Sequence, residues 1–377
     1  MSQRREDLDR ALPAVLVGAP AQAGGLFRLG DNASVRPLIP ALLVLAASGA
    51  AGPARPTSPA PAPAVGIALN LEPSTRPAVR QETVEMVRRT GASFFALTLS
   101  WSAAEPSPGK YNVAEITRAA RLLRQSGATL HLDLPVVTEA ARDVPADLET
   151  VAFDDPRLSL RLGRLLDALM PALLDFQTLS LGDAADVHFA DKPDELRAYR
   201  RLFEGAVQFL KKKTPHLLVG VTTLAPSESP APEVAAALHQ KSPLLLYIYC
   251  PFVKDKPFEQ RAPDALEKDW PLLVKDAAGR PIAFPTVSYS SSPENASSPG
   301  KQAEFIRAFR RFLAKADGRN LLFARYVALR DPGPAGTELA QDASVVQRRR
   351  AAFLGNRGLE TRAGDPKPSW LEWAKGP

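Results

Sequence analysis

Strand-like apolar runs alternate with helical patterns eight times between residues 65 and 329, and this alternation restricts the fold more than any other feature. Strictly alternating β and α units predict a parallel sheet, and eight of them allow the sheet to close. We therefore predict an α/β chain folded as a (βα)8 TIM barrel. A doubly wound open sheet is the alternative, but no glycine-rich phosphate loop follows the first run. The expected strands are 65–71, 94–101, 129–137, 176–183, 217–224, 244–252, 281–290 and 321–329.

Three of the intervening stretches have apolar residues at the spacing of an amphipathic helix, namely 113–125, 193–213 and 302–316. Pro193 marks the expected start of the second helix, and Asp317-Gly318 marks the expected end of the third. Barrels of this type run to about 250 residues, so the length of 377 residues allows one large barrel or two ordinary domains, and the alternation favours one barrel.

The first 51 residues are expected to form an N-terminal extension with an export signal. The apolar run from Leu38 to Ala47 is too short to span a bilayer but suits the core of a signal peptide. Translation from Val35 would make this signal compact, and a disordered Ala/Pro tail is the alternative. Segment 52–64 is an expected Pro/Ala linker, and the barrel is expected at 65–377. We predict a secreted or periplasmic protein of bacterial type with no stable membrane span.

The composition argues against several classes of partner. The net charge is +6, but Lys and Arg are scattered among nearly as many acids, so no nucleic-acid partner is predicted. Cys250 is the one cysteine, which excludes an internal disulfide and a cysteine zinc cluster. The four histidines lack metal-ligand spacing, so neither a metal nor a cofactor is expected.

Alternation within the strands predicts which side chains face the barrel axis. In the third run the three leucines at 130, 132 and 134 share one face, which turns His131 and Asp133 inward. The side chains expected to face the axis are mostly small or polar, which fits a site at the C-terminal end of the strands. Mutual pairing of His131 with Asp133 is the structural alternative. The other expected inward residues are Gly66, Ala68, Asn70, Thr178, Ser180, Gly182 and Ala184.

Five segments, in order along the chain, carry a resemblance to a known group of enzymes. They resemble segments of the clan-A (βα)8 glycoside hydrolases, especially the endo-galactanase-like and endo-glucanase-like members. The resemblance covers about residues 65–374 and implies a sugar-cleaving barrel. The segments are WSAAEPSPGKYN (101–112), LSLGDAADVH (179–188), YIYCPF (247–252), TVSYSSSPENASSPGKQ (286–302) and GLETRAGDPKPSW (358–370).

The same resemblance puts the two usual catalytic glutamates at Ala184 and Thr286. Retaining glycosidases need one carboxylate as acid/base and one as nucleophile. Alanine cannot transfer a proton, and an unactivated threonine hydroxyl is a poor nucleophile. The usual mechanism is therefore not expected. A rebuilt pair that joins Asp133 to Asp183 or Asp186 is the alternative, although alternation points Asp183 away from Ala184.

Sugar binding is expected to outlast the loss of chemistry. Sugars are held by flat aromatic faces and by polar side chains. Residues of these kinds follow the strands, although the aromatics are equally suited to plug the barrel mouth. The expected substrate-binding residues are Asn70, Trp101, His131, His188, Tyr249, Phe252, Ser288 and Tyr289.

Together these features predict a glycosidase-like barrel that is catalytically inactive. We expect it to bind an oligosaccharide or polysaccharide, or to act as a scaffold beside an envelope protein. An active glycosidase or transglycosidase with relocated carboxylates is one alternative. A structural pseudoenzyme that binds protein is the other.

Overall fold

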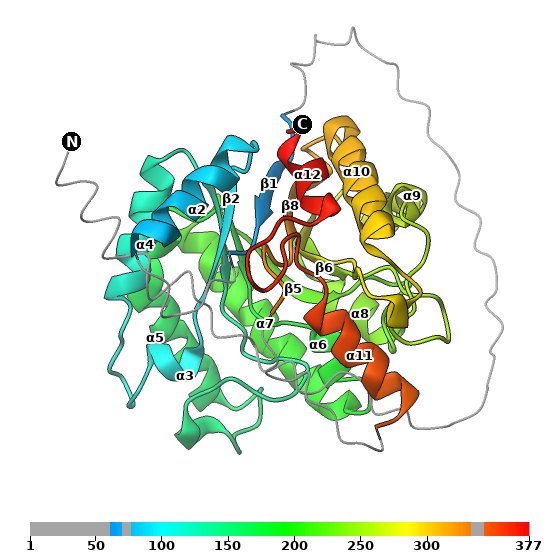
Figure 1. Cartoon of the computed structure of the whole chain (residues 1–377). Helices are drawn as coiled ribbons and strands as arrows, with labels where there is room; N and C mark the ends of the chain where they lie inside the picture. The colour runs from blue at the N-terminus through cyan, green and yellow to red at the C-terminus, as the bar shows by residue number, and fades with distance from the viewer. Residues whose placement is uncertain (1–60, 70–76, 333–342, 377) are drawn as a thin grey trace, which may run out of the picture.

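The computed structural model describes residues 61–69, 77–332 and 343–376 (Figure 1). Eight strands form one parallel sheet in the order β1-β8-β7-β6-β5-β4-β3-β2. This order places the first strand next to the last, which confirms the (βα)8 barrel and excludes the doubly wound sheet. The strands are β1 Ala64–Ile67, β2 Phe94–Thr98, β3 Thr129–Asp133, β4 Thr178–Ser180, β5 Leu218–Leu224, β6 Leu244–Tyr249, β7 Ile282–Val287 and β8 Leu321–Tyr326.

The barrel is nearly closed between β1 and β2. The amide of Ser93 donates to the carbonyl oxygen of Val65 at 2.9 Å, which joins the two strands at their beginning. A Cβ atom on Gly66 would lie 2.6 Å from the carbonyl oxygen of Phe94. The two backbones therefore approach so closely that only glycine fits at position 66 without a shift.

Helices surround the sheet as the alternation requires, and further short helices lie in the connections (Figure 1). The expected helices at 113–125 and 193–213 are confirmed as α4 and α7. The third begins earlier than expected, at Pro299, because the Ser298 hydroxyl caps it by accepting from the Lys301 amide. The helices of the outer layer are α2 Pro77–Arg89, α4 Ala114–Gln125, α5 Pro156–Leu173, α7 Pro193–Lys213, α8 Pro232–His239, α9 Ala265–Ala277, α10 Pro299–Lys315 and α12 Pro368–Ala374. The connections contain α3 Trp101–Ala104, η1 Ala146–Leu148, α6 Ala185–His188, η2 Pro293–Asn295 and α11 Val345–Gly355.

The floor of the barrel is apolar and its upper part is polar. Phe94 and Phe323 stack with ring centroids 4.1 Å apart and pack with Leu244, Leu246 and Ala283. The His131 ring lies 5.1 Å from the Phe323 ring and marks the change from apolar to polar side chains. Polar groups therefore collect toward the C-terminal ends of the strands.

The C-terminal helix α12 completes the outer layer by packing against α10 (Figure 1). Trp373 of this helix is fully buried, and its indole N–H donates to the Thr90 hydroxyl at 2.9 Å. Thr90 directly follows α2, so this bond joins the end of the first described helix to the last one.

The predicted export signal, and the linker up to residue 60, lie outside the described residues. Within the described residues, no helix is both long and apolar enough to cross a bilayer.

Candidate functional site

Three charged side chains from three strands meet at the C-terminal end of the barrel. Asp133 is the last residue of β3, Arg325 lies in β8, and Asp183 follows β4 by three residues. Arg325 donates from Nε to the Pro285 carbonyl oxygen at 2.7 Å, and its charge acts on both carboxylates. All three side chains are partly buried.

The two carboxylates have opposite electrostatic surroundings. Burial, followed by the charges of Asp133 and Glu139, raises the pKa of Asp183 to about 7. Burial also acts to raise the pKa of Asp133, but the charge and hydrogen bond of His131 outweigh it and hold that pKa below its ordinary value. Near neutral pH the site therefore holds one ionised aspartate and one that is partly protonated.

His131 is buried beneath this cluster. Its Nε2 lies 2.8 Å from Asp133 Oδ1, and its Nδ1 lies 2.8 Å from the Thr178 hydroxyl. The expected inward orientation of His131 and Asp133 is confirmed, and so is their pairing. Because both ring nitrogens are engaged within the protein, His131 positions Asp133.

The chain after β4 departs from the expected alternation. The Ser180 hydroxyl donates to the Gly182 carbonyl oxygen at 2.7 Å, and a Cβ on Gly182 would lie 3.0 Å from the Tyr199 hydroxyl of α7. Gly182 thus faces the helices, and the prediction that it faces the axis is wrong. Ala184 is buried and has a left-handed backbone conformation, with φ of 47°. This turn brings the Asp183 carboxylate among the charges of Asp133 and Arg325.

Asp186 has a different role from Asp183. It is fully buried, and burial raises its pKa to about 6. Oδ1 accepts from the Leu224 amide at 3.0 Å, and Oδ2 accepts from the Ser229 hydroxyl. Since both oxygens are engaged, Asp186 ties α6 to the end of β5 and is a structural residue.

The aromatic side chains expected to bind sugar lie within the core. Trp101, Tyr249 and Tyr289 have no exposed surface, so they offer no ring face to a ligand. The tyrosine hydroxyls donate to Asp269 and to the Arg261 carbonyl oxygen, at 2.9 and 2.7 Å. The expectation of exposed aromatic platforms is therefore wrong for these three residues, because their rings pack within the main hydrophobic core.

Phe252 is partly buried and packs on Phe258 and Phe353, with ring centroids 5.3 and 4.9 Å away. It therefore forms part of a satellite core beneath α11. The packing alternative for the aromatic residues is the one that the structure supports.

The segment around Trp101 has a structural role. The Glu105 carboxylate is buried and accepts from the Trp101 indole at 2.9 Å, from the Gly109 amide at 2.8 Å and from Arg161 Nε at 2.8 Å. These bonds fasten the connection between β2 and α4 to α5. The resemblance in this segment thus reflects packing and not a sugar-binding surface.

The other expected binding residues are not gathered in one place. His188 lies in the connection to α7, with Nε2 3.6 Å from the Glu195 carboxylate, and burial lowers its pKa to about 4. Ser288 is buried beside the Cys250 thiol, and Thr286 is partly buried in β7 opposite Ile248. Asn70 lies outside the described residues.

Two arginines at this end were not anticipated from the sequence. The inward direction of Arg325 could have been predicted, because alternation along β8 turns it to the same face as Phe323. Arg357 lies in the irregular segment between α11 and α12, where no periodicity indicates its direction. The described residues contain no group of three or more His, Cys, Asp or Glu that could hold a metal ion.

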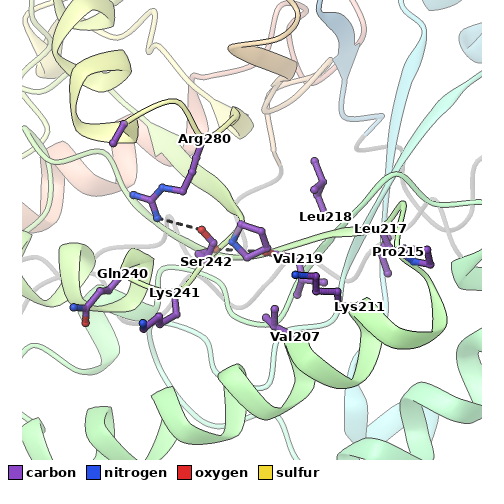
Figure 2. A pocket seen from close by; sticks show the side chains of 12 residues that line it. Val207, Lys211, Pro215, Leu217, Leu218, Val219, Gln240, Lys241, Ser242 and Arg280 are labelled. Atoms are coloured by element: carbon purple, nitrogen blue, oxygen red, sulfur yellow. Dashed lines mark hydrogen bonds between the residues drawn. The ribbon is translucent and has the colours of Figure 1, made fainter. Parts of the chain in front are cut away.

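A cavity of about 520 Å³ lies at the opposite end of the barrel, beside the start of β5 and the C-terminal end of α7 (Figure 2). Lys211, Lys241 and Arg280 line it together with apolar side chains. We call the charged cluster of Asp133, Asp183 and Arg325 the axial site. None of these three residues lines the cavity, so the cavity is separate from the axial site.

The fold of this chain is similar to that of solved glycosidase structures. No protein-family model and no curated protein matches the chain. Among solved structures, a GH5_18 protein from Streptomyces cattleya in complex with GlcNAc is similar, with a TM-score of 0.61 and 14% identity over 84% of this chain and 80% of that chain. The chain has the fold of the clan-A glycoside hydrolases.

Other structures of this glycosidase fold agree. A GH5_18 protein from Bifidobacterium longum subsp. longum has a TM-score of 0.60 and 12% identity, covering 84% of this chain and 78% of that chain. An exo-β-1,4-mannosidase from Opitutaceae bacterium strain TAV5 has a TM-score of 0.57 and 14% identity, covering 83% of this chain and 58% of that chain. Glycosidase barrels keep their chemistry at the C-terminal ends of the strands, where the axial site lies.

Proposed function

We propose that this protein binds carbohydrate at the axial site and does not cleave it by the two-carboxylate mechanism of retaining glycosidases. The observation that carries the proposal is the convergence of Asp133, Asp183 and Arg325 from three strands at the end of a glycosidase-type barrel. Carboxylates accept hydrogen bonds from sugar hydroxyls, and a guanidinium donates to them. The similar Streptomyces cattleya protein has been solved with GlcNAc, and a variant of it with Manβ1-4GlcNAc, which supports a sugar as the ligand class.

The occupants of the two expected catalytic positions support binding without this chemistry. Ala184 and Thr286 carry no carboxylate, and Ala184 is buried in a left-handed turn. By contrast, Asp183 is partly exposed, and no described residue donates a hydrogen bond to its carboxylate. It is therefore available to a ligand. We further propose that the protein is exported and binds its glycan in the envelope or outside the cell.

A second candidate function rests on the electrostatic difference between the two aspartates. General acid and base pairs have environments that separate their pKa values, as the surroundings of Asp183 and Asp133 do. In this alternative Asp183 protonates the leaving oxygen and Asp133 activates a water molecule. The product would have an inverted anomeric centre.

A binding assay with a release assay distinguishes these functions. The full chain is titrated calorimetrically with GlcNAc, Manβ1-4GlcNAc and a panel of neutral and acidic oligosaccharides, and reducing-end release is followed for every ligand that binds. We expect binding without release, weakened at least tenfold by Asp183→Asn and unchanged by Asp191→Asn at an exposed position. Release that Asp183→Asn abolishes would instead establish the hydrolase. Failure of every oligosaccharide to bind would overturn both functions and favour the structural role.

A further inference from the structure

The Arg357 guanidinium has no partner among the described residues and lies at the same end of the barrel as the axial site. Its Nε atom is buried and has no hydrogen-bond partner, and no described residue forms an ion pair with its guanidinium. Burial lowers the pKa of Arg357, but a guanidinium stays protonated in proteins. The residue is partly exposed, so its guanidinium reaches solvent while its Nε lacks a protein partner, and a ligand from outside the chain can supply that partner.

The groups around Arg357 leave its charge largely uncompensated. They are Cys250, Tyr326, Arg350 and Glu139. The thiol and the phenol are neutral near pH 7, because burial raises the pKa of each well above its ordinary value. Arg350 has the same sign as Arg357, so the single acid among these groups, Glu139, faces two arginines. An anionic group would therefore be attracted to this position.

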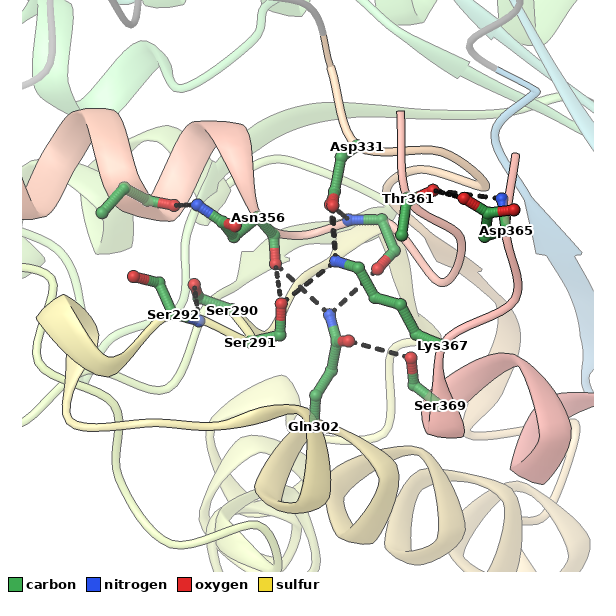
Figure 3. Close-up of polar contacts among 12 residues, drawn as sticks. Ser290, Ser291, Ser292, Gln302, Asp331, Asn356, Thr361, Asp365, Lys367 and Ser369 are labelled. Carbon is green, nitrogen blue, oxygen red and sulfur yellow. Dashed lines mark hydrogen bonds and ion pairs between the residues drawn. The ribbon is translucent and has the colours of Figure 1, made fainter. Parts of the chain in front are cut away.

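The backbone on both sides of Arg357 is held rigidly (Figure 3). The Asn356 carbonyl oxygen accepts from the Ser291 amide at 2.9 Å, and the Gly358 amide donates to Asp331 Oδ1 at 2.8 Å. The buried Lys367 Nζ joins these anchors, because it lies 3.0 Å from the Ser291 hydroxyl and 2.7 Å from Asp331 Oδ1.

Gln302 of α10 adds a further bond, from its amide nitrogen to the Gly358 carbonyl oxygen at 3.2 Å. A Cβ on Gly358 would collide with the backbone of Arg330, so the segment lies directly on the chain after β8. Arg357 is thus presented from a fixed backbone, which reduces the entropy lost when its side chain binds a ligand.

Arg357 and the axial site share a neighbour. Glu139 acts electrostatically on both Asp183 and Arg357. Arg357 also lies near Tyr326, which follows Arg325 at the end of β8. A ligand that binds at both positions must therefore extend from the axial site past Glu139.

We propose that Arg357 binds the carboxylate of a uronic acid residue, so that the glycan held at the axial site is acidic. This inference rests on the proposed function, because it assigns the class of sugar to the same site. A planar guanidinium matches a carboxylate with two parallel hydrogen bonds. The aspartates of the axial site hold the hydroxyls of the ring, and Arg357 distinguishes an acidic sugar from a neutral one.

Matched ligands and variants test the inference on the full chain. Oligogalacturonate and oligoglucuronate are compared calorimetrically with their carboxyl-reduced counterparts and with sulfated oligosaccharides. We expect the wild type to bind one uronate roughly 10- to 100-fold more tightly than its reduced form, the effect of a hydrogen bond to a charged group. Arg357→Gln should remove this preference and leave the weaker binding of the neutral form in place. Arg362→Gln, at an exposed position in the same segment, is the control.

Thermal unfolding of Arg357→Gln establishes that the variant is folded, and Arg357→Lys provides a second variant that keeps the charge but loses the fork. Equal binding of acidic and reduced oligosaccharides by the wild type would overturn the inference while the proposed function stands. Preference for the sulfated ligand would overturn the carboxylate assignment. If no glycan binds at all, the proposed function and this inference both fail.

Discussion

At the scale of single residues, Asp133 and Asp183 show that the pKa of an aspartate depends on its position in the fold. Asp133 is bonded to His131, which favours its ionised form. Burial raises the pKa of Asp183, and the like charges of Asp133 and Glu139 add to this effect. The positive charge of Arg325 only partly offsets these effects. The difference is therefore a property of the packed site and not of the residue type.

This difference predicts a pH-dependent effect of Asp183→Asn on stability. Since the pKa of Asp183 rises from 3.8 to about 7 on folding, the folded protein holds a proton that the unfolded chain loses. The contribution of Asp183 to the stability of the wild type therefore falls as pH rises from about 4 to about 7. The amide does not ionise, so the melting temperature of the variant relative to wild type should increase over this interval. Thermal unfolding at pH 4.5, 6 and 8 measures the change, and Asp191→Asn should show none. Parallel curves for wild type and Asp183→Asn would contradict the assignment.

At the scale of elements, the junction of β1 with β2 depends on one glycine. An alanine at Gly66 would place its Cβ 2.6 Å from a backbone oxygen, which no rotation of a side chain can relieve. The strands must separate instead, which disturbs the packing of Phe94 on the barrel floor. The closure of the barrel is therefore sensitive to a single methyl group.

Two identical substitutions should have opposite effects on the free energy of unfolding. Gly66→Ala should lower it by about 1–3 kcal/mol, the typical cost of overpacking. Gly205 lies at an exposed position of α7, where a Cβ meets nothing within 4 Å. Gly205→Ala should raise the free energy of unfolding by roughly 0.5–1 kcal/mol, because alanine favours the helix. Urea unfolding of both variants measures the two effects. A neutral result for Gly66→Ala would show that the junction is wider than the structure has it.

At the scale of the whole molecule, the first and last helices of the described chain are joined through Trp373. Its indole is fully buried, bonds to Thr90 and lies near the rings of Phe309 and Tyr326. The ring of helices is thus closed by a contact between residues 283 positions apart. Loss of this contact should loosen the entire barrel.

Trp373→Ala should lower the free energy of unfolding by about 3–5 kcal/mol, as expected for a large aromatic removed from a core. Trp373→Phe should cost less, because it keeps the ring and loses one hydrogen bond of about 1 kcal/mol. Trp270→Ala, on a partly exposed ring of α9, is the matched control with an intermediate loss. Equal losses for the two alanine variants in urea unfolding would argue against a closing role for α12.

The number and order of the strands were predictable because they depend on periodicity within segments of 3 to 7 residues. The inward direction of His131 and Asp133 follows from the same local rule. The rule fails at Gly182, since β4 ends at Ser180 and bonds from distant residues shape the turn. Burial of Trp101 was also not predictable, because it depends on Glu105 and Arg161, which lie on different elements.

The sequence by itself therefore determined a (βα)8 barrel, the polar character of its upper interior and the absence of carboxylates at Ala184 and Thr286. The tertiary structure decided which charges meet. Asp133, Asp183 and Arg325 are separated by 50 and 142 residues along the chain, and only the closed barrel brings them into one electrostatic site. Local propensity acts over a few residues, whereas charge interactions depend on distances that barrel closure sets.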